Sequence, residues 1–279
     1  MADYILRRLF YMLITLFAVA SILFLMFRML PGEATLQVIS PAMDEAVQQR
    51  MKAAFGLDKP LLQQYFIYLK NLVTMEWGRS FVTAQEVTAI VWYRFWNTLL
   101  LMVSGLCMTL TLGIGLGIIM AWKRNSPLDI GGTIVGLVFQ AAPPFITGLL
   151  LLMTLSYRLG LFPTGGMYPP GERPDSLFGL LLMPAFWERI VLPTFTVGMY
   201  YLATPLLVMR DSMLEVLGSD YIELARAKGL KPSIIMFRHA ARNALLGVVT
   251  LASIMVGFAV GGQVVVESLF SWPGMGQLM

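Results

Sequence analysis

The sequence has few of the residues on which catalytic and metal sites usually depend. Its 279 residues include one cysteine, Cys107, and one histidine, His239. One cysteine excludes a disulfide within the chain, and one histidine excludes the paired-histidine motifs that hold zinc. A Ser-His-Asp type site would depend on His239 alone. The sequence also lacks the G-x-x-x-x-G-K-[ST] pattern of a P-loop, which excludes ATP hydrolysis by that route. We therefore expect no catalytic residues, no metal site and no cofactor.

Charged residues are scarce as well. They make up 13% of the chain, about half the share that is usual in globular proteins, while 57% of the residues are hydrophobic. The apolar residues come in long runs, which predicts an integral membrane protein surrounded by the lipid bilayer. The net charge of +4 does not indicate nucleic-acid binding, because excess Lys and Arg in a membrane protein gather in its cytoplasmic loops.

Five apolar runs predict an all-α polytopic membrane protein with about five transmembrane helices. The runs are Leu9–Phe27, Leu99–Trp122, Ile130–Tyr157, Ile190–Met209 and Asn243–Val266. None of them contains an acidic or basic residue, whereas a proton- or ion-coupled carrier usually keeps such groups inside the membrane. A cleaved signal peptide is the alternative for the first run.

Proline and glycine mark particular places in these runs. Pro143-Pro144 breaks the third run, because two prolines remove backbone donors and kink a membrane helix. Gly113, Gly115 and Gly117 lie within the second run, where small residues let neighbouring membrane helices approach closely.

The runs divide the chain into three parts. Residues 1–27 form an N-terminal tail and the first membrane helix, residues 28–96 an external segment with short interfacial helices, and residues 97–279 the transmembrane core. Within the external segment, Ala42–Phe55 and Leu61–Met75 are expected to be helical.

Two further stretches are expected at a membrane interface. Val87–Trp96 is amphipathic and rich in aromatic residues, as is typical of that layer. Leu177–Trp187 is apolar but too short to span a bilayer.

The distribution of basic residues predicts the orientation. With a cytoplasmic N-terminus, the inside segments are residues 1–8, 123–129 and 210–242, which hold ten of the twenty Lys and Arg in a small part of the chain. Cytoplasmic loops carry the excess of Lys and Arg, so we expect the N-terminus inside.

Residues 211–242 form a charged hairpin between the fourth and fifth runs. Asp220 can cap a first short helix, with Glu223 three residues on completing a capping-box-like pair. Gly229 suits the left-handed position that ends this helix, and Pro232 suits the first turn of the next. A polar helical hairpin held between membrane spans is suited to docking into a soluble partner.

The second helix of the hairpin is expected to be amphipathic. Its apolar stripe would consist of Ile234, Ile235, Phe237 and Ala241. Arg238 and Arg242, four residues apart, would form a basic stripe.

Within the hairpin, Glu223 to Gly229 (ELARAKG) resembles the EAA loop of binding-protein-dependent ABC importers. The stretch DYIELARAKGLKPSIIMFRHAARNALLGVVT resembles the dipeptide/oligopeptide/nickel permease family. The similarity extends along nearly the whole chain. It includes RMLPGEA (28–34), FGLDKPLLQQYFIYLKNL (55–72), WGRSF (77–81), LGLFPTGG (159–166), LPTFTVGM (192–199) and ESLFSWPGMGQL (267–278).

The chain departs from the family pattern at three places. Leu224 stands where the loop has its first alanine, and Gly247 stands where the family often has proline. Family members have a sixth span after the FSWPGMG segment, whereas this sequence ends at Met279.

The resemblance implies the type I ABC importer permease fold and a multi-pass location in a bacterial inner membrane. It also implies the partners: a second homologous permease chain, two cytoplasmic ABC ATPase subunits and an external or periplasmic substrate-binding protein. The residues expected to couple the chain to the ATPase are Glu223, Ala225, Arg226, Gly229, Arg238 and His239.

The cargo implied by the resemblance is small peptides or peptide-like solutes, with nickel chelates, glutathione or opine-like compounds as alternatives. A stand-alone secondary transporter or channel is the rival from another class. Candidate pathway-lining residues are Gln140, Thr147, Thr194, Thr196, Tyr200, Thr204 and Gln263. For each, an interhelical hydrogen bond is the alternative role.

Overall fold

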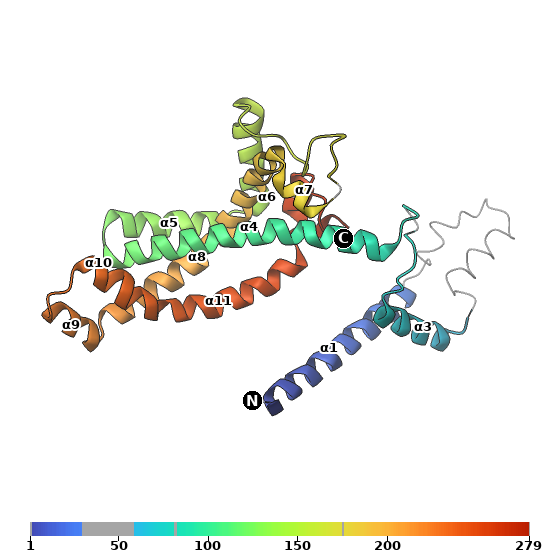
Figure 1. Ribbon diagram of the computed structural model, residues 1–279, viewed down its shortest axis with the longest axis horizontal. Coiled ribbons are helices and arrows are strands. Elements are labelled where there is room, and N and C mark those ends of the chain that lie inside the picture. Colours follow the sequence, from blue (N-terminus) through green and yellow to red (C-terminus); the bar gives the residue numbers. More distant parts are fainter. Residues whose placement is uncertain (1, 30–58, 81–82, 175, 279) are drawn as a thin grey trace. The chain divides into compact units, whose positions relative to one another are not determined.

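A computed structural model describes residues 2–29, 59–80, 83–174 and 176–278. In these ranges the regular elements are helices, apart from an isolated antiparallel bridge between Arg79 and Glu86 (Figure 1). The all-α prediction is therefore confirmed. The predicted helix Ala42–Phe55 and most of the RMLPGEA segment lie outside the described residues. The chain forms two compact units, residues 1–90 and 91–279, and the boundary falls inside helix α4 (Val87–Trp122).

The first unit contains α1 (Ala2–Met29) and α3 (Leu61–Thr74), which pack against each other. Phe24 of α1 meets the ring of Tyr65 edge-on, with centroids 5.2 Å apart, and Ser21 shares a 2.5 Å hydrogen bond with the Tyr65 hydroxyl. Most other described side chains of α1 are exposed and apolar, as lipid-facing side chains are.

Among the residues that the structure describes, four helical stretches are long and apolar enough to cross a membrane, or five if one bent pair is counted as a span. The four are α1, α4, α8 (Pro184–Leu217) and residues Pro232–Ala259, which comprise α10 (Pro232–Ile234), a π-helix (Ile235–Ala240) and most of α11 (Ala241–Gly261). They agree with the predicted polytopic fold. At 1.5 Å per residue α4 and α8 are each roughly 50 Å long, so both extend beyond a hydrocarbon core of about 30 Å.

The bent pair is the predicted broken span. Its first half is α5 (Pro127–Ala141), and its second half is α6 (Pro144–Leu151) followed by a π-helix over Leu152–Arg158. The chain bends by 102° between the two halves. Ala142 is extended because a residue before proline is disfavoured in the helical region, and Pro144 opens α6 at its first turn. The expected break at Pro143-Pro144 is thus confirmed.

Several helix boundaries differ from the predicted runs. α4 begins at Val87, so the stretch Val87–Trp96 continues into the second span. Leu177–Trp187 is divided between α7 (Leu177–Leu182) and the start of α8. The fifth run ends early, because Gly262 at φ +75° separates α11 from α12 (Val264–Leu269).

A glycine seam joins α4 to α8. A Cβ on Gly113 would fall 2.9 Å from the Pro205 ring, and one on Gly117 would fall 2.7 Å from the Leu206 carbonyl oxygen. One turn before Gly113, Thr109 donates a 2.8 Å hydrogen bond to the Gly198 carbonyl. A Cβ on Gly115 would meet nothing within 4 Å, so the expected close approach is confirmed for Gly113 and Gly117 alone.

α12 and the residues after it pack against the part of α4 that lies in the second unit. The Glu267 side chain is fully buried and accepts a 2.8 Å hydrogen bond from Thr98. The Trp272 indole donates to the Asn97 carbonyl at 2.9 Å, and the Asn97 amide donates to the Pro273 carbonyl at 2.8 Å. This segment, ESLFSWPGMGQL, thereby covers one end of a core that includes Phe186.

Candidate functional site

The charged hairpin lies where α8 ends and α11 begins, with α9 (Asp220–Ala227) and α10 between them (Figure 1). The predicted cap at Asp220 is wrong. Ser219 occupies the N-cap position, and its hydroxyl donates to the Val216 carbonyl at 2.6 Å instead of capping α9. Asp220 lies inside the first turn, where a negative charge favours the helix dipole. Ser219 therefore satisfies a carbonyl at the end of α8, and the capping box with Glu223 does not form.

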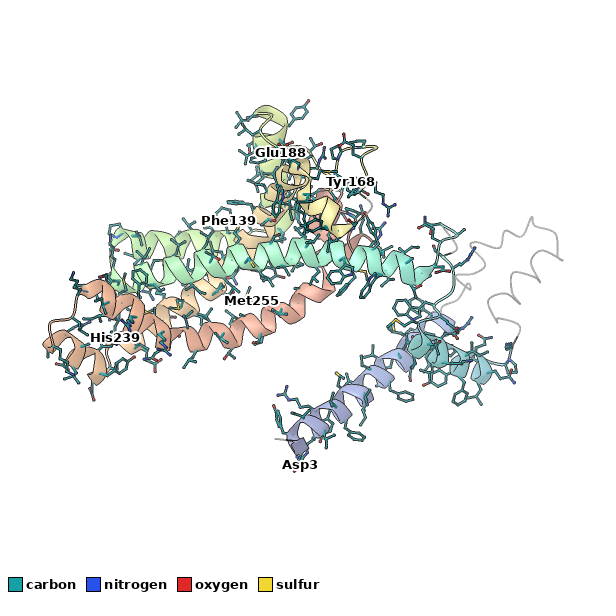
Figure 2. All side chains as sticks on the ribbon, viewed as in Figure 1. Asp3, Phe139, Tyr168, Glu188, His239 and Met255 are labelled. Carbon is teal, nitrogen blue, oxygen red and sulfur yellow. The ribbon has the colours of Figure 1, made fainter. Side chains whose placement is uncertain are left out.

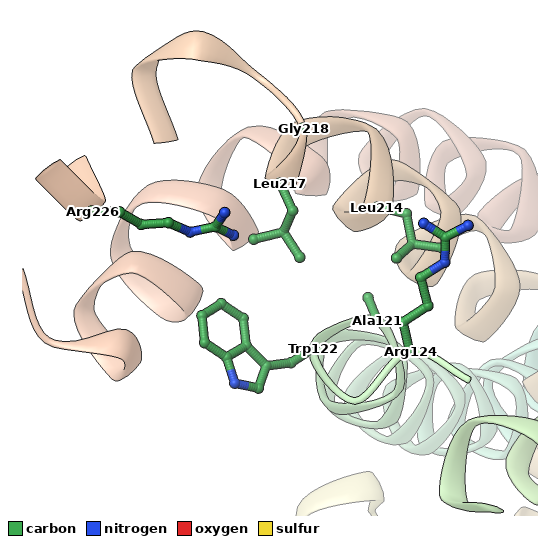
Figure 3. A pocket seen from close by; sticks show the side chains of 7 residues that line it. All are labelled: Ala121, Trp122, Arg124, Leu214, Leu217, Gly218 and Arg226. Atoms are coloured by element: carbon green, nitrogen blue, oxygen red, sulfur yellow. The ribbon is translucent and has the colours of Figure 1, made fainter. Parts of the chain in front are cut away.

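α9 has one buried face and one exposed face. Ile222 and Ala225 are buried, whereas Glu223 and Arg226 are exposed. Three of these residues are predicted to couple the chain to the ATPase. Ala225 packs into the core, whereas the Glu223 carboxylate is accessible to solvent or to a partner. The Arg226 side chain lines a cavity against the end of α4 (Figure 3).

Gly229 ends α9 as the sequence predicts. Its φ is +71°, a conformation that glycine adopts without steric penalty. The Gly229 amide donates to the Arg226 carbonyl at 2.9 Å, and the Leu230 amide donates to the Ala225 carbonyl at 3.3 Å. This pair of bonds is a Schellman motif, which satisfies the free carbonyls at a helix end. Pro232 then occupies the first turn of α10, so both predicted signals of the break are confirmed.

The π-helix over Ile235–Ala240 changes the face that the second helix buries. Ile235 and Ala241 are buried as expected, but Ile234 and Phe237 are 36% and 55% exposed. Half of the predicted apolar stripe therefore lies outside the core. For Phe237 the reason is the wider π-turn, which inserts a residue and rotates those that follow. Arg238 is exposed and His239 is half-buried at this end of the second unit (Figure 2).

One apolar core holds the hairpin against three long helices. It contains Ile118 and Ala121 of α4, Met209 and Met213 of α8, Ile222 and Ala225 of α9, and Ala244 and Val248 of α11. A 2.7 Å hydrogen bond from the Asn243 amide to the Tyr221 hydroxyl also ties α11 to α9. Burial of a side chain such as Ile222 stabilises by about 1.5–3 kcal/mol. A force applied to the hairpin is therefore passed to α4, α8 and α11.

An ion pair that the sequence analysis missed lies beside this core. Arg210 of α8 binds both carboxylate oxygens of Asp129 in α5, at 2.5 Å through Nε and 3.0 Å through a terminal nitrogen. The Asp129 side chain is 3% exposed and also accepts a hydrogen bond from the backbone N–H of Asn125 at 2.9 Å. The partners are 81 residues apart, and no local pattern marks them. The pair fastens the start of α5 to α8 directly before the hairpin.

We expect Asp129→Asn to destabilise the protein, because it leaves a largely buried guanidinium without its anion. Breaking such a pair from one side costs about 3–5 kcal/mol when it is fully buried, and somewhat less here because Arg210 is 21% exposed. Thermal unfolding of the detergent-solubilised chain measures this. Asp211→Asn is the matched control: Asp211 also pairs with Arg210 but is 69% exposed, so its loss costs about 0–1 kcal/mol. Equal effects of the two substitutions would contradict this assignment.

The candidate pathway residues cluster around α8, and several form hydrogen bonds between helices. The Gln140 amide of α5 donates to Thr204 at 3.1 Å. Thr194 shares a 2.7 Å hydrogen bond with Ser104 of α4. The Gln263 amide donates to the Tyr201 hydroxyl at 2.7 Å.

The other candidates are placed differently. Thr196 is fully buried and donates to the Leu192 carbonyl of its own helix at 2.9 Å. Tyr200 and Thr147 are half-buried. The contacts of Gln140, Thr194, Thr204 and Gln263 suit the alternative role, in which they join helices, and the role of all seven residues in a pathway stays a prediction. Among the described residues, no group of three or more His, Cys, Asp or Glu is placed to hold a metal ion.

Sequence comparison gives matches over almost the whole chain. Residues 113–279 match the family described as binding-protein-dependent transport system inner membrane component. Residues 1–102 match the family described as the N-terminal part of binding-protein-dependent transport system membrane components. The two matches together include both the hairpin and the FSWPGMG segment.

Curated relatives are similar over the full length of this chain. A Brucella suis biovar 1 (strain 1330) protein, provisionally named a peptide permease, is 37% identical over 282 residues. The oligopeptide transport system permease protein AppB of Bacillus subtilis (strain 168) is 35% identical, and the glutathione transport system permease protein GsiC of Escherichia coli (strain K12) is 34% identical. Each alignment covers 100% of this chain and 86% of the relative.

Proposed function

Because the chain belongs to the family of binding-protein-dependent transport system inner membrane components, we propose that it forms half of the translocation pathway of an ATP-driven importer. A second homologous permease chain supplies the other half. Two cytoplasmic ABC ATPase subunits drive the cycle, and an external or periplasmic binding protein delivers the solute. The N-terminus lies in the cytoplasm, which places the hairpin on the same side as the ATPases.

The hairpin is the proposed coupling element, and its shared core with three long helices is the observation that carries this role. Ile222 and Ala225 are packed between α4, α8 and α11, while Glu223 and Arg238 remain exposed. A partner that holds the exposed face can therefore move the spans as a rigid body. Rocking of packed helices around a central site is the usual form of alternating access.

The proposed cargo is small peptides or peptide-like solutes. The relatives named above are an oligopeptide permease and a glutathione permease, and glutathione is itself peptide-like. The predicted spans carry no charged residue, which suits a wide hydrated path with selectivity set by the binding protein. Nickel chelates and opine-like compounds are the alternative cargoes.

Purification of the tagged chain from native membranes tests the assembly. We expect an ABC ATPase and a second permease to be recovered with it, and the reconstituted assembly to take up labelled di- and oligopeptides only with ATP. Arg238→Glu reverses a charge on the exposed face of the hairpin and should reduce ATPase recovery at least severalfold. Mass spectrometry of the recovered subunits measures this.

Arg158→Glu is the matched control for the charge reversal. Arg158 is also exposed, but it follows the third span and lies on the opposite side of the membrane in the proposed topology. Recovery of the ATPase should not change. Solute flux through the purified chain alone, with no ATPase present, would instead support the stand-alone transporter or channel.

A further inference from the structure

A cavity of about 350 Å³ lies between the hairpin and the end of α4. Its walls are Ala121, Trp122 and Arg124 at the end of α4, Leu214, Leu217 and Gly218 at the end of α8, and Arg226 of α9 (Figure 3). The volume falls within the range of ordinary small-ligand sites, roughly 300–1,000 Å³. The coupling role uses the hairpin's core and its exposed face, and it leaves this cavity unexplained.

The cavity combines positive charge with an apolar surface. Figure 3 shows the guanidinium groups of Arg124 and Arg226 on opposite sides, with the Trp122 ring and the Leu217 side chain between them. Among the described residues neither guanidinium forms an ion pair, although the Asp129 carboxylate attracts Arg124 electrostatically. Two such groups beside apolar walls suit a phosphate that is attached to an apolar body.

The position of the cavity along α4 indicates that this ligand comes from the lipid bilayer. Trp122 is the last residue of the α4 span, and Lys123 and Arg124 follow it directly. Tryptophan at a helix end lies at the headgroup layer of a bilayer, and basic residues beyond it lie in that layer or in water. The cavity is therefore level with lipid phosphates.

We propose that this cavity binds the headgroup of an anionic phospholipid. Arg124 and Arg226 contact the phosphate, and Trp122, Leu214 and Leu217 contact the glycerol and the upper acyl chains. Basic pockets between membrane helices on the cytoplasmic side bind such headgroups. The bound lipid joins α9 to the end of α4 and makes the hairpin stiffer. The cytoplasmic placement rests on the proposed function.

Fluorescence quenching tests the site in the purified full-length chain. Phosphatidylglycerol with acyl chains brominated near the headgroup is titrated in mixed micelles, and Trp122→Phe identifies the contribution of Trp122 among the six tryptophans. We expect the Trp122 component, taken as the difference between the wild type and Trp122→Phe, to be quenched saturably. The double variant Arg124→Gln and Arg226→Gln should weaken it by about tenfold or more, because each basic residue near an anionic surface contributes substantially to attraction.

The double variant Arg238→Gln and Arg242→Gln is the matched control, since it removes the same charge from exposed positions of the same hairpin region. Its lipid affinity should equal that of the wild type. Equal saturable quenching by brominated phosphatidylcholine would overturn the proposal, as would full competition by inorganic phosphate, which would indicate a site for free phosphate. Loss of the co-purified ATPase in the Arg124 and Arg226 variant with unchanged lipid quenching would overturn it in favour of a protein partner. The quenching needs no ATPase, so failure of the proposed function leaves this readout intact.

Discussion

Gly229→Pro should abolish ATP-dependent uptake while the spans remain folded. Proline holds φ near −65°, whereas Gly229 has φ +71°, and proline also lacks the amide that donates to the Arg226 carbonyl. The Schellman motif cannot form, so the chain leaves α9 in a different direction and the hairpin loses its fixed shape. We expect uptake to fall at least tenfold and ATPase recovery in a pull-down to fall with it. Labelled-peptide uptake by proteoliposomes and subunit quantification measure the two effects.

Gly229→Ala separates backbone strain from steric hindrance. A Cβ at this position would meet nothing within 4 Å, so the alanine variant carries only the left-handed penalty of about 1–2 kcal/mol. Gly218→Ala adds the same methyl group to the same hairpin at an ordinary φ of −88° and should leave coupling nearly unchanged. The expected order of impairment is therefore proline, then alanine, then the Gly218 control. Wild-type uptake by the proline variant would show that the break at Gly229 does not serve coupling.

The parts of this fold that the sequence predicts are those set by local rules. A membrane-spanning helix must satisfy its own backbone polar groups, so long apolar runs identify it. The break at Pro143-Pro144 and the end of α9 at Gly229 follow from the backbone limits of proline and glycine. These features depend on a few neighbouring residues, which a sequence displays directly.

The features that the sequence does not predict depend on competition between neighbouring residues for one position, or on residues that are far apart in the chain. Ser219 and Asp220 are adjacent and both suit an N-cap, and the choice follows from how α8 ends. The π-helix over Ile235–Ala240 is not marked by any particular residue composition, so a regular 3.6-residue period misassigns Phe237. The Asp129–Arg210 pair joins residues that only the folded chain brings together.

The sequence predicts where the candidate site lies better than it predicts which way each of its side chains points. ELARAKG identifies the hairpin by resemblance, and the hairpin is found where the charge pattern places it. The direction of each side chain depends on packing, which turns Ala225 into the core and Arg226 toward the end of α4. A motif alone therefore cannot separate residues that face a partner from residues that support the motif.

Gly117→Leu should prevent α4 and α8 from packing and lower the yield of folded protein. A Cβ at Gly117 would fall 2.7 Å from the Leu206 carbonyl oxygen, 2.8 Å from Met209 Cβ and 3.1 Å from the Arg210 amide nitrogen. Two of these atoms belong to the backbone, so no side-chain rotation relieves the overlap and the helices must separate. Overpacking typically costs about 1–3 kcal/mol and more where the backbone must move. We expect the thermal midpoint in detergent to fall by about 5 °C or more.

Gly115→Leu is the control that isolates this contact. It lies two residues away on the same apolar helix and adds the same side chain, but a Cβ there would meet nothing within 4 Å. Hydropathy, membrane insertion and helix propensity change equally in the two variants, so only helix packing distinguishes them. Gly115→Leu should therefore retain wild-type yield, stability and ATPase recovery. Equal losses in both variants would mean that insertion of α4, and not its seam with α8, limits folding. A loss confined to Gly117→Leu would place the seam among the contacts that carry motion from the hairpin into the membrane, because the Gly117 contacts at Met209 and Arg210 adjoin the core beneath α9.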